Sequence, residues 1–143
     1  MGRRQELEKR QILLARFGRL IAAETRLDAL LSIVAEEVRR ILDADRCSVF
    51  LLDAYKGELW TKVALGMGEK VLRVPMGQGI AGFVAKTGNA VNIRDAYRDT
   101  RFNQELDRLT GYKTKNLLAV PLKGRDAAVL GVFEVLNKNK GSF

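Results

Sequence analysis

The sequence contains no histidine and only one cysteine, Cys47. Without histidine the chain cannot build a Ser–His or Cys–His nucleophile pair, a histidine-ligated haem or zinc site, or a phosphohistidine relay. A single cysteine forms neither an internal disulfide nor a multi-thiolate metal site. These absences favour a binding protein over an enzyme, and we expect no cofactor and no metal.

Long apolar runs are also missing. No stretch approaches the roughly 20 apolar residues that cross a bilayer, and the basic, polar N-terminus lacks the apolar centre of a signal peptide. We therefore predict no membrane partner and, by default, a cytoplasmic location. At 143 residues, with 47% hydrophobic and 29% charged residues, the composition is that of a single soluble globular domain.

The net charge of +8 raises the question of a nucleic-acid partner. Basic residues gather near the N-terminus, but Glu6, Glu8 and Glu24 are interleaved with them. There is no recognition motif and no basic strip punctuated by aromatic residues. The charge pattern therefore favours a solvated surface, and we predict no binding to nucleic acid.

The first segment, residues 1–24, carries a helical pattern. Its apolar residues recur at spacings of three, four and seven along one stripe: Leu7, Leu14, Phe17 and Ile21. Such a stripe either packs on the chain's own domain or forms a parallel coiled-coil seam between two copies. We predict an amphipathic helix for signalling and dimerisation, and hence a homodimer joined through helices.

The remainder alternates helical and extended patterns. A second amphipathic helix is predicted for residues 27–42, with Thr25 as its cap, and short helices for 79–86 and 103–109. Strands are predicted for residues 47–52, 58–64, 71–74, 90–93, 116–121 and 129–137. Because neighbouring strands lie at hairpin spacing, the pattern indicates an antiparallel sheet with helices packed on it, an α+β fold.

The pattern Gly77-x-Gly79-x-x-Gly82 resembles two phosphate-binding motifs. The dinucleotide-binding interpretation fails because the preceding strand is broken by Pro75 and no repeated β-α-β units follow. The protein-kinase interpretation fails because the His-Arg-Asp catalytic loop is missing. Free N–H groups at the start of a helix still attract anions, so Ile80 and Ala81 are candidate backbone donors. A tight connection into a packed helix explains the local pattern equally well.

Seven further stretches carry a family resemblance: DRCSVFLLD (45–53), GIAG (79–82), NIRDAY (92–97), RFN (101–103), TGYKTKN (110–116), VP (120–121) and GVFEVLNK (131–138). In these stretches the chain resembles the GAF domains, and within them the cyclic-nucleotide-binding GAF domains of phosphodiesterases and cyanobacterial adenylyl cyclases. The resemblance covers residues 46–138 and implies a six-stranded antiparallel sheet with flanking helices and a lid over a ligand pocket. It assigns 25–143 to the GAF domain.

The resemblance also implies a function and a set of ligand-binding residues. The function is that of a regulatory sensor domain that binds a cyclic nucleotide and relays the signal to an output domain; it implies no catalysis. The implied contacts are Ser48 and Arg46 for the purine edge, the N–H groups of Ile80 and Ala81 for the cyclic phosphate, lid residues Asn103, Asp107, Thr110 and Thr114, and Glu134 on the last strand.

These assignments differ in how well the residues alone support them. Glu134 is the best supported, because a carboxylate between apolar neighbours on a central strand is costly without a role. Ser48 can equally fill a half-buried strand position, and Asp107 can be a solvated helix charge. Thr110 and Thr114 can simply stabilise a turn around Gly111.

The sequence departs from the family pattern at two places. Some cyclic-GMP-binding members carry an aromatic residue and an acid on the second strand, where this chain has Ala64 and Leu65; the missing acid favours cyclic AMP over cyclic GMP. The family signature that begins with Asn137 and Lys138 stops here at Phe143, before its acids. We expect a final helix to be absent and Lys138 to lack its structural partner, with the output domain following Phe143.

Two other functions stay open. The chain can be a ligand-free GAF module for dimerisation and signal transmission, or it can bind another small molecule. A covalent bilin needs a cysteine in the lid, whereas Cys47 lies on the first predicted strand. A GAF domain of the methionine-sulfoxide-reductase kind needs several cysteines, and the single cysteine of this chain excludes it.

Overall fold

The computed structural model describes residues 2–23, 27–64 and 72–143, and in this part of the chain six strands form one antiparallel sheet. The order across the sheet is β3-β2-β1-β6-β5-β4, so β1 and β6 are central. The strands are β1 (Ala44–Asp53), β2 (Glu58–Ala64), β3 (Arg73–Pro75), β4 (Val91–Ile93), β5 (Leu117–Lys123) and β6 (Val129–Lys138). The predicted α+β fold with a six-stranded antiparallel sheet is confirmed.

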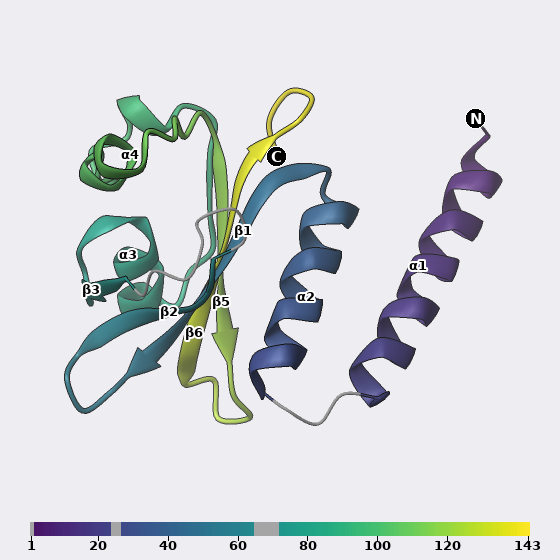
Figure 1. Ribbon diagram of the computed structural model, residues 1–143, viewed down its shortest axis with the longest axis horizontal. Helices are drawn as coiled ribbons and strands as arrows, with labels where there is room; N and C mark the ends of the chain where they lie inside the picture. Colours follow the sequence, from purple (N-terminus) through teal and green to yellow (C-terminus); the bar gives the residue numbers. More distant parts are fainter. Residues whose placement is uncertain (1, 24–26, 65–71) are drawn as a thin grey trace.

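Helices lie on both faces of the sheet (Figure 1). They are α1 (Arg3–Ala23), α2 (Leu27–Ile41), α3 (Gly79–Thr87) and α4 (Glu105–Thr110), with a 3-10 turn at Ala96–Arg98. Helix α2 packs on one face and α1 lies outside it, whereas α3 and α4 lie on the opposite face. None of the helices in the described ranges is long and apolar enough to span a membrane.

The alternation of side chains along β1 and β6 produces two cores. Cys47 and Val49 join Phe133 and Val135 beneath α2, whereas Phe50, Val132 and Leu136 join the core that also includes α3. Because successive side chains on a strand point to opposite faces, Ser48 and Glu134 point to the α3 face. These two residues are direct neighbours in the β1–β6 pairing, so two polar groups lie side by side on the face that also carries Phe50, Val132 and Leu136.

Helix α1 exposes much of its apolar stripe. Leu7 and Leu14 are 53% and 61% exposed, and Ile12, on another side of the helix, is 67% exposed. The side chains of Phe17 and Ile21 lie outside the described part. The helix itself forms as its periodicity predicts, and the homodimer through helices stays a prediction.

Several boundaries differ from those predicted. β1 begins at Ala44 instead of residue 47, because the chain reverses within two residues and Asp43 adopts a φ of 51°. β3 includes Pro75, which an edge strand tolerates because its missing N–H is not needed for pairing. Thr25, the predicted cap, and residue 71 lie outside the described residues.

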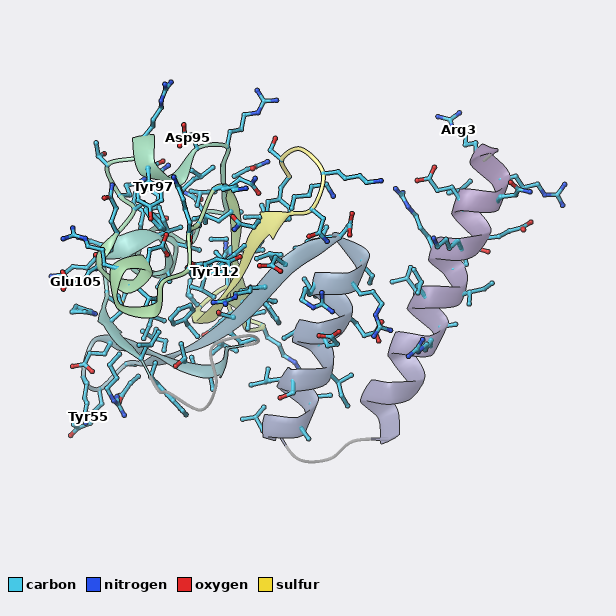
Figure 2. The ribbon with its side chains drawn as sticks, turned by 45° about the horizontal axis from the view of Figure 1, so that its top comes forward. Arg3, Tyr55, Asp95, Tyr97, Glu105 and Tyr112 are labelled. Atoms are coloured by element: carbon cyan, nitrogen blue, oxygen red, sulfur yellow. The ribbon has the colours of Figure 1, made fainter. Side chains whose placement is uncertain are left out.

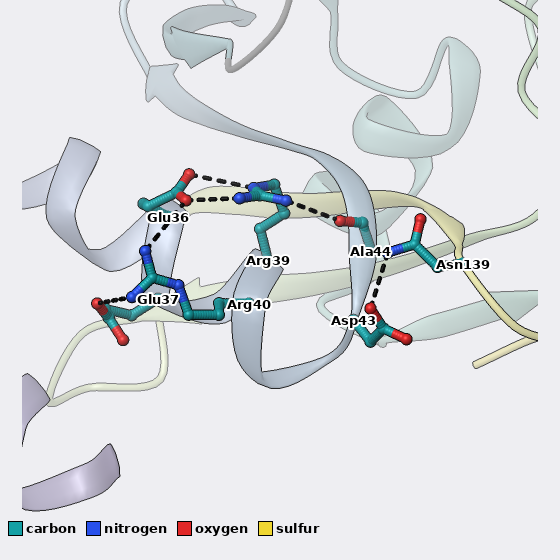
Figure 3. A network of polar contacts seen from close by, with 7 residues as sticks. All are labelled: Glu36, Glu37, Arg39, Arg40, Asp43, Ala44 and Asn139. Carbon is teal, nitrogen blue, oxygen red and sulfur yellow. Dashed lines mark hydrogen bonds and ion pairs between the residues drawn. The ribbon is translucent and has the colours of Figure 1, made fainter.

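A polar network fixes the end of α2 to the sheet (Figure 3). Arg39 donates to Glu36 Oε1 and Oε2 at 2.6 and 3.1 Å, and to the Ala44 carbonyl oxygen at 3.2 Å. On the other side of the turn, Asn139 Nδ2 donates to Asp43 Oδ1 at 2.8 Å. The connection between α2 and β1 is therefore tied to the segment that follows β6.

Lys138 contacts the end of α2, whereas the absence of its acidic partner in the family signature stays a prediction. Its ammonium donates a hydrogen bond of 2.7 Å to the carbonyl oxygen of Leu42 and lies 5.9 Å from the centre of the Phe143 ring. Leu42 is at the C-terminal end of α2, where carbonyl groups lack intrahelical donors. Lys138 therefore caps α2 directly from β6.

Candidate ligand-binding site

A pocket on the α3 face of the sheet is lined by residues from the start of α3 and from the segment that contains α4. Seven of the nine residues predicted from the family resemblance line it: Arg46, Ile80, Ala81, Asn103, Asp107, Thr114 and Glu134. Phe50, Val74 and Leu136 supply apolar wall between them. The fold thus brings together residues from β1, β6, α3, α4 and the loops around α4.

The other two predicted residues are placed differently. Ser48 is buried on β1 opposite Glu134, and it stays outside the set of lining residues, where the longer side chains of Arg46 and Phe50 flank it. The side chain of Thr110 lies outside the described part of the chain.

The glycine turn shapes one end of the pocket. Gly77 and Gly79 have φ angles of 85° and 68°, which other residues rarely adopt. At Gly82 a Cβ atom would lie 2.8 Å from the Pro75 carbonyl oxygen, so the turn has no room for a side chain there. The turn is closed by a 2.9 Å hydrogen bond from the Gly77 N–H to the Gly82 carbonyl.

The start of α3 follows directly from this turn. Ile80 and Ala81 bury their side chains in the core, while both residues line the pocket. The first N–H groups of a helix have no intrahelical acceptor and lie at the positive end of the helix dipole. This end of the pocket therefore suits an anionic group.

Asp107 organises the opposite wall. Its carboxylate accepts hydrogen bonds from Thr114 N–H at 2.7 Å, Thr114 Oγ1 at 2.9 Å and Tyr97 Oη at 2.7 Å. Asp107 and Thr114 are both buried. The alternative that Asp107 is a solvated helix charge is therefore wrong: it joins three parts of the segment that covers the pocket.

Further contacts order the segment that covers the pocket, residues 94–115, and one of them joins it to α3. Arg101 forms a bidentate pair with Asp99 at 2.6 and 2.9 Å, and its guanidinium lies 4.7 Å from the centre of the Phe83 ring on α3. Tyr97 meets the ring of Phe102 edge-on at 5.5 Å. The segment, on the side of the molecule remote from α1 (Figure 2), is thus packed as a cover over the pocket.

Tyr112 is a pocket residue that the sequence did not single out. The Arg46 guanidinium lies 3.7 Å from the centre of its ring. Its hydroxyl donates to Asp45 Oδ2 at 2.7 Å and accepts from Asn137 Nδ2 at 2.9 Å. Burial, followed by the bond to Asp45, raises the pKa of Tyr112 above its ordinary range. Asp45 and Arg46 are adjacent on β1, but Tyr112 and Asn137 lie far from them in sequence, so no local pattern could have indicated this cluster.

Glu134 is a pocket carboxyl group whose acidity is strongly perturbed. Burial and then the charge of Asp107 raise the pKa of its carboxyl to about 7, compared with about 4.3 for an ordinary glutamate. Near neutral pH the group can therefore accept hydrogen bonds as a carboxylate or donate one as an acid. Clusters of three or more potential metal ligands are not found among the described residues.

This pKa predicts a pH dependence of stability that Glu134→Gln should remove. The folded-state pKa of about 7 lies above the unfolded value. The stability that protonated Glu134 contributes to the folded protein is therefore fully present below about pH 4.5 and is lost as the pH rises through 7. At pH 8 the variant should exceed the wild type in free energy of unfolding by about 1–2 kcal/mol, the open pocket screening part of the effect. At pH 4.5 the two should be equal.

Urea unfolding of the ligand-free protein at several pH values measures this difference. Glu105→Gln is the matched control, because Glu105 is exposed on α4 and its replacement should leave the pH profile unchanged. Parallel profiles for Glu134→Gln and the wild type would contradict the prediction.

The fold and the pocket define an α+β domain that holds its candidate site on one face of an antiparallel sheet. A family model described as GAF domain matches residues 26–143. The chain belongs to the GAF domain family, a family of regulatory sensor domains, and the resemblance stated from the sequence is confirmed.

The chain is similar to parts of several phosphodiesterases. It is 42% identical over 110 residues to the dual 3',5'-cyclic-AMP and -GMP phosphodiesterase 11A of Takifugu rubripes, an alignment that covers 69% of this chain and 12% of that protein. It is 36% identical over 129 residues to the probable 3',5'-cyclic phosphodiesterase pde-5 of Caenorhabditis elegans, covering 82% and 18%. The chain thus spans less than a fifth of the length of these relatives.

Solved structures agree on the fold. The GAF domain of a phosphoenolpyruvate-protein phosphotransferase from Coxiella burnetii superposes with a TM-score of 0.81 at 22% identity, covering 93% of this chain and 80% of that one. The free methionine-R-sulfoxide reductase of Neisseria meningitidis superposes with a TM-score of 0.74 at 21% identity, covering 88% and 71%. At these identities the likeness concerns the fold alone.

Proposed function

We propose that this chain is a regulatory GAF domain that binds a cyclic purine nucleotide in the pocket and relays its occupancy to an output domain. The observation that carries the proposal is the convergence of the α3 N-terminus, the Asp107–Thr114 pair and Glu134 on one pocket. These groups come from three separate stretches of the sequence, namely α3, the segment 94–115 and β6. Small-molecule sites typically combine an apolar wall with a few converging polar groups of this kind.

The pocket offers complementary groups for each part of such a ligand. The N–H groups at Ile80 and Ala81 suit the cyclic phosphate. Threonine and carboxylate groups suit the ribose and the polar edge of the base. The apolar side chains of Phe50, Val74 and Leu136 suit the faces of a purine.

The relatives support the same class of ligand and suggest the output. Their names describe enzymes that act on cyclic nucleotides, and this chain matches only a small part of each. We extend the proposal to a catalytic output domain elsewhere in a longer polypeptide, with the cover over the pocket and the helices α1 and α2 passing on the signal. The homodimer through helices belongs to this proposal, since α1 leaves Leu7 and Leu14 exposed.

The sequence favours cyclic AMP, because Ala64 and Leu65 stand where some cyclic-GMP-binding members carry an aromatic residue and an acid. The side chain of Ala64 and all of Leu65 lie outside the described part of the structure. Both nucleotides therefore belong in the test.

Titration calorimetry of the chain with cyclic AMP and cyclic GMP tests the proposal. We expect saturable binding of at least one nucleotide and a loss of about tenfold in affinity for Thr114→Val, the change expected when one buried hydrogen bond to a charged group is lost. Thr87→Val is the matched control, because Thr87 is exposed at the other end of α3. Failure of the wild type to bind either nucleotide would overturn the proposal and favour the ligand-free module.

A further inference from the structure

Arg46 and Tyr112 form a stacked pair at the edge of the candidate pocket. The Arg46 guanidinium carbon lies 3.7 Å from the centre of the Tyr112 ring, and both residues line the pocket. Arg46 projects from β1, whereas Tyr112 follows α4 in the segment that covers the pocket. The pair therefore joins the sheet to the cover at the ligand site.

The tyrosine ring is held from both central strands. Its hydroxyl donates to Asp45, the neighbour of Arg46 on β1, and accepts from Asn137 near the end of β6. Asn137 is itself fixed, because its Oδ1 accepts from the Lys115 N–H at 2.6 Å and its Nδ2 also donates to the Lys113 carbonyl at 2.9 Å. A ring tied in this way is a rigid platform.

A rigid platform changes what Arg46 can do. Arginine has up to about 2 kcal/mol of side-chain entropy to lose when it binds a ligand, and stacking on a fixed ring removes part of that cost beforehand. In the described part of the chain, no residue forms an ion pair or a hydrogen bond with the Arg46 guanidinium. Its N–H groups are therefore available to a ligand.

We propose that Tyr112 is a positioning residue that holds Arg46 against the base of the bound nucleotide, so that Arg46 favours a purine with an oxygen at ring position 6. The inference rests on the proposed function and adds a determinant of ligand choice. A guanidinium only donates hydrogen bonds. Guanine presents an acceptor oxygen at position 6 beside the acceptor N7, whereas adenine presents a donor amino group there.

The preference of Arg46 for guanine opposes the preference for cyclic AMP that was inferred from Ala64 and Leu65. The missing acid on the second strand lowers the affinity for guanine, and the stacked Arg46 raises it. The ratio of the two affinities, and not either affinity alone, isolates the effect of the pair.

The test measures dissociation constants of cyclic GMP, cyclic AMP and cyclic IMP for the wild type and three variants. Tyr112→Leu removes the platform, Tyr112→Phe keeps the ring but removes its two tethers, and Arg46→Gln removes the donors. We expect Tyr112→Leu and Arg46→Gln each to weaken cyclic GMP relative to cyclic AMP by about tenfold, the loss of one good charged contact. Tyr112→Phe should produce a smaller change of about two- to threefold.

Cyclic IMP and a double variant sharpen the result. Cyclic IMP keeps the oxygen at position 6 and lacks the 2-amino group, so its affinity should fall with that of cyclic GMP. In the variant that combines Tyr112→Leu with Arg46→Gln, the ratio of the cyclic GMP and cyclic AMP affinities should change no further than in Arg46→Gln alone, because Tyr112 acts through Arg46. Arg46→Gln leaves the apolar cores untouched and keeps the test decisive if Tyr112→Leu does not fold.

The outcomes separate this inference from the proposed function. Equal weakening of all three nucleotides would overturn the inference, since it would indicate a phosphate contact by Arg46 or a purely structural role for Tyr112. An unchanged ratio in Arg46→Gln would also overturn it, while leaving nucleotide binding established. A wild type that binds none of the three nucleotides overturns the proposed function and this inference together.

Discussion

Replacing Gly131 with alanine is expected to lower the free energy of unfolding by about 3 kcal/mol, the upper end of the usual cost of overpacking. A Cβ atom at this position would lie 2.2 Å from the Phe50 carbonyl oxygen. Gly131 pairs with Leu51 on β1 and with Leu122 on β5, so strands on both sides restrain its backbone. Neither neighbour can withdraw without breaking ladder hydrogen bonds.

Urea unfolding of Gly131→Ala beside Gly124→Ala measures the effect. Gly124 lies in the turn before β6, and a Cβ atom there would meet only side-chain atoms, at ordinary contact distances of 3.5 Å or more. The control should therefore stay within about 0.5 kcal/mol of the wild type. A loss below 1 kcal/mol for Gly131→Ala would show that the central strands separate more easily than their pairing indicates.

Gly131 also affects the candidate site, because it helps to fix the register between β1 and β6. The same pairing that brings Gly131 against Leu51 sets Ser48 opposite Glu134 and Arg46 opposite Leu136. A shift of one residue would turn Glu134 to the α2 face, because successive side chains alternate. The absence of a side chain at Gly131 thus preserves the arrangement of the pocket.

The sheet could be predicted from local patterns because the sequences of its central strands fit few structures other than a buried strand. β1 and β6 carry apolar residues on both faces, and the turns between strands carry glycine or aspartate at the points of reversal. The start of β1 was missed because Asp43, Ala44 and Asp45 have the composition of a loop. Tertiary contacts decide their conformation: Ala44 is buried beneath α2, and Asp45 accepts a hydrogen bond from Tyr112.

The candidate site could be predicted only in part, for a similar reason. The glycine turn carries a local signal, and Glu134 is conspicuous as an acid among apolar neighbours. The role of Asp107 depends on how the cover folds, since its partners Tyr97 and Thr114 lie ten and seven residues away on either side. The Arg46–Tyr112 pair joins residues 66 positions apart, and no spacing rule extends over that distance.

Asp107→Ala is expected to have the largest effect on the pocket, with nucleotide affinity falling by a factor of about 100 or more. The variant loses three hydrogen bonds to a charged acceptor, each contributing about 1.5–3 kcal/mol though not additively, and leaves the buried Thr114 N–H without its partner. We expect a loss of about 2–4 kcal/mol in stability. The affinity and stability of Asp107→Asn should lie between those of the wild type and Asp107→Ala, because an amide oxygen accepts only some of the three hydrogen bonds.

Hydrogen exchange of the Thr114 amide tests the structural part of this prediction without any ligand. In the wild type that amide donates to Asp107 Oδ2 at 2.7 Å, so exchange should accelerate strongly in Asp107→Ala while amides of β1 and β6 change only with global stability. Glu105→Ala, an exposed acid on the same helix, is the matched control. Retained protection of Thr114 together with nucleotide affinity within threefold of the wild type would contradict the prediction. Loss of protection without loss of affinity would instead show that the ligand restores the cover, because binding energy would then offset the missing carboxylate.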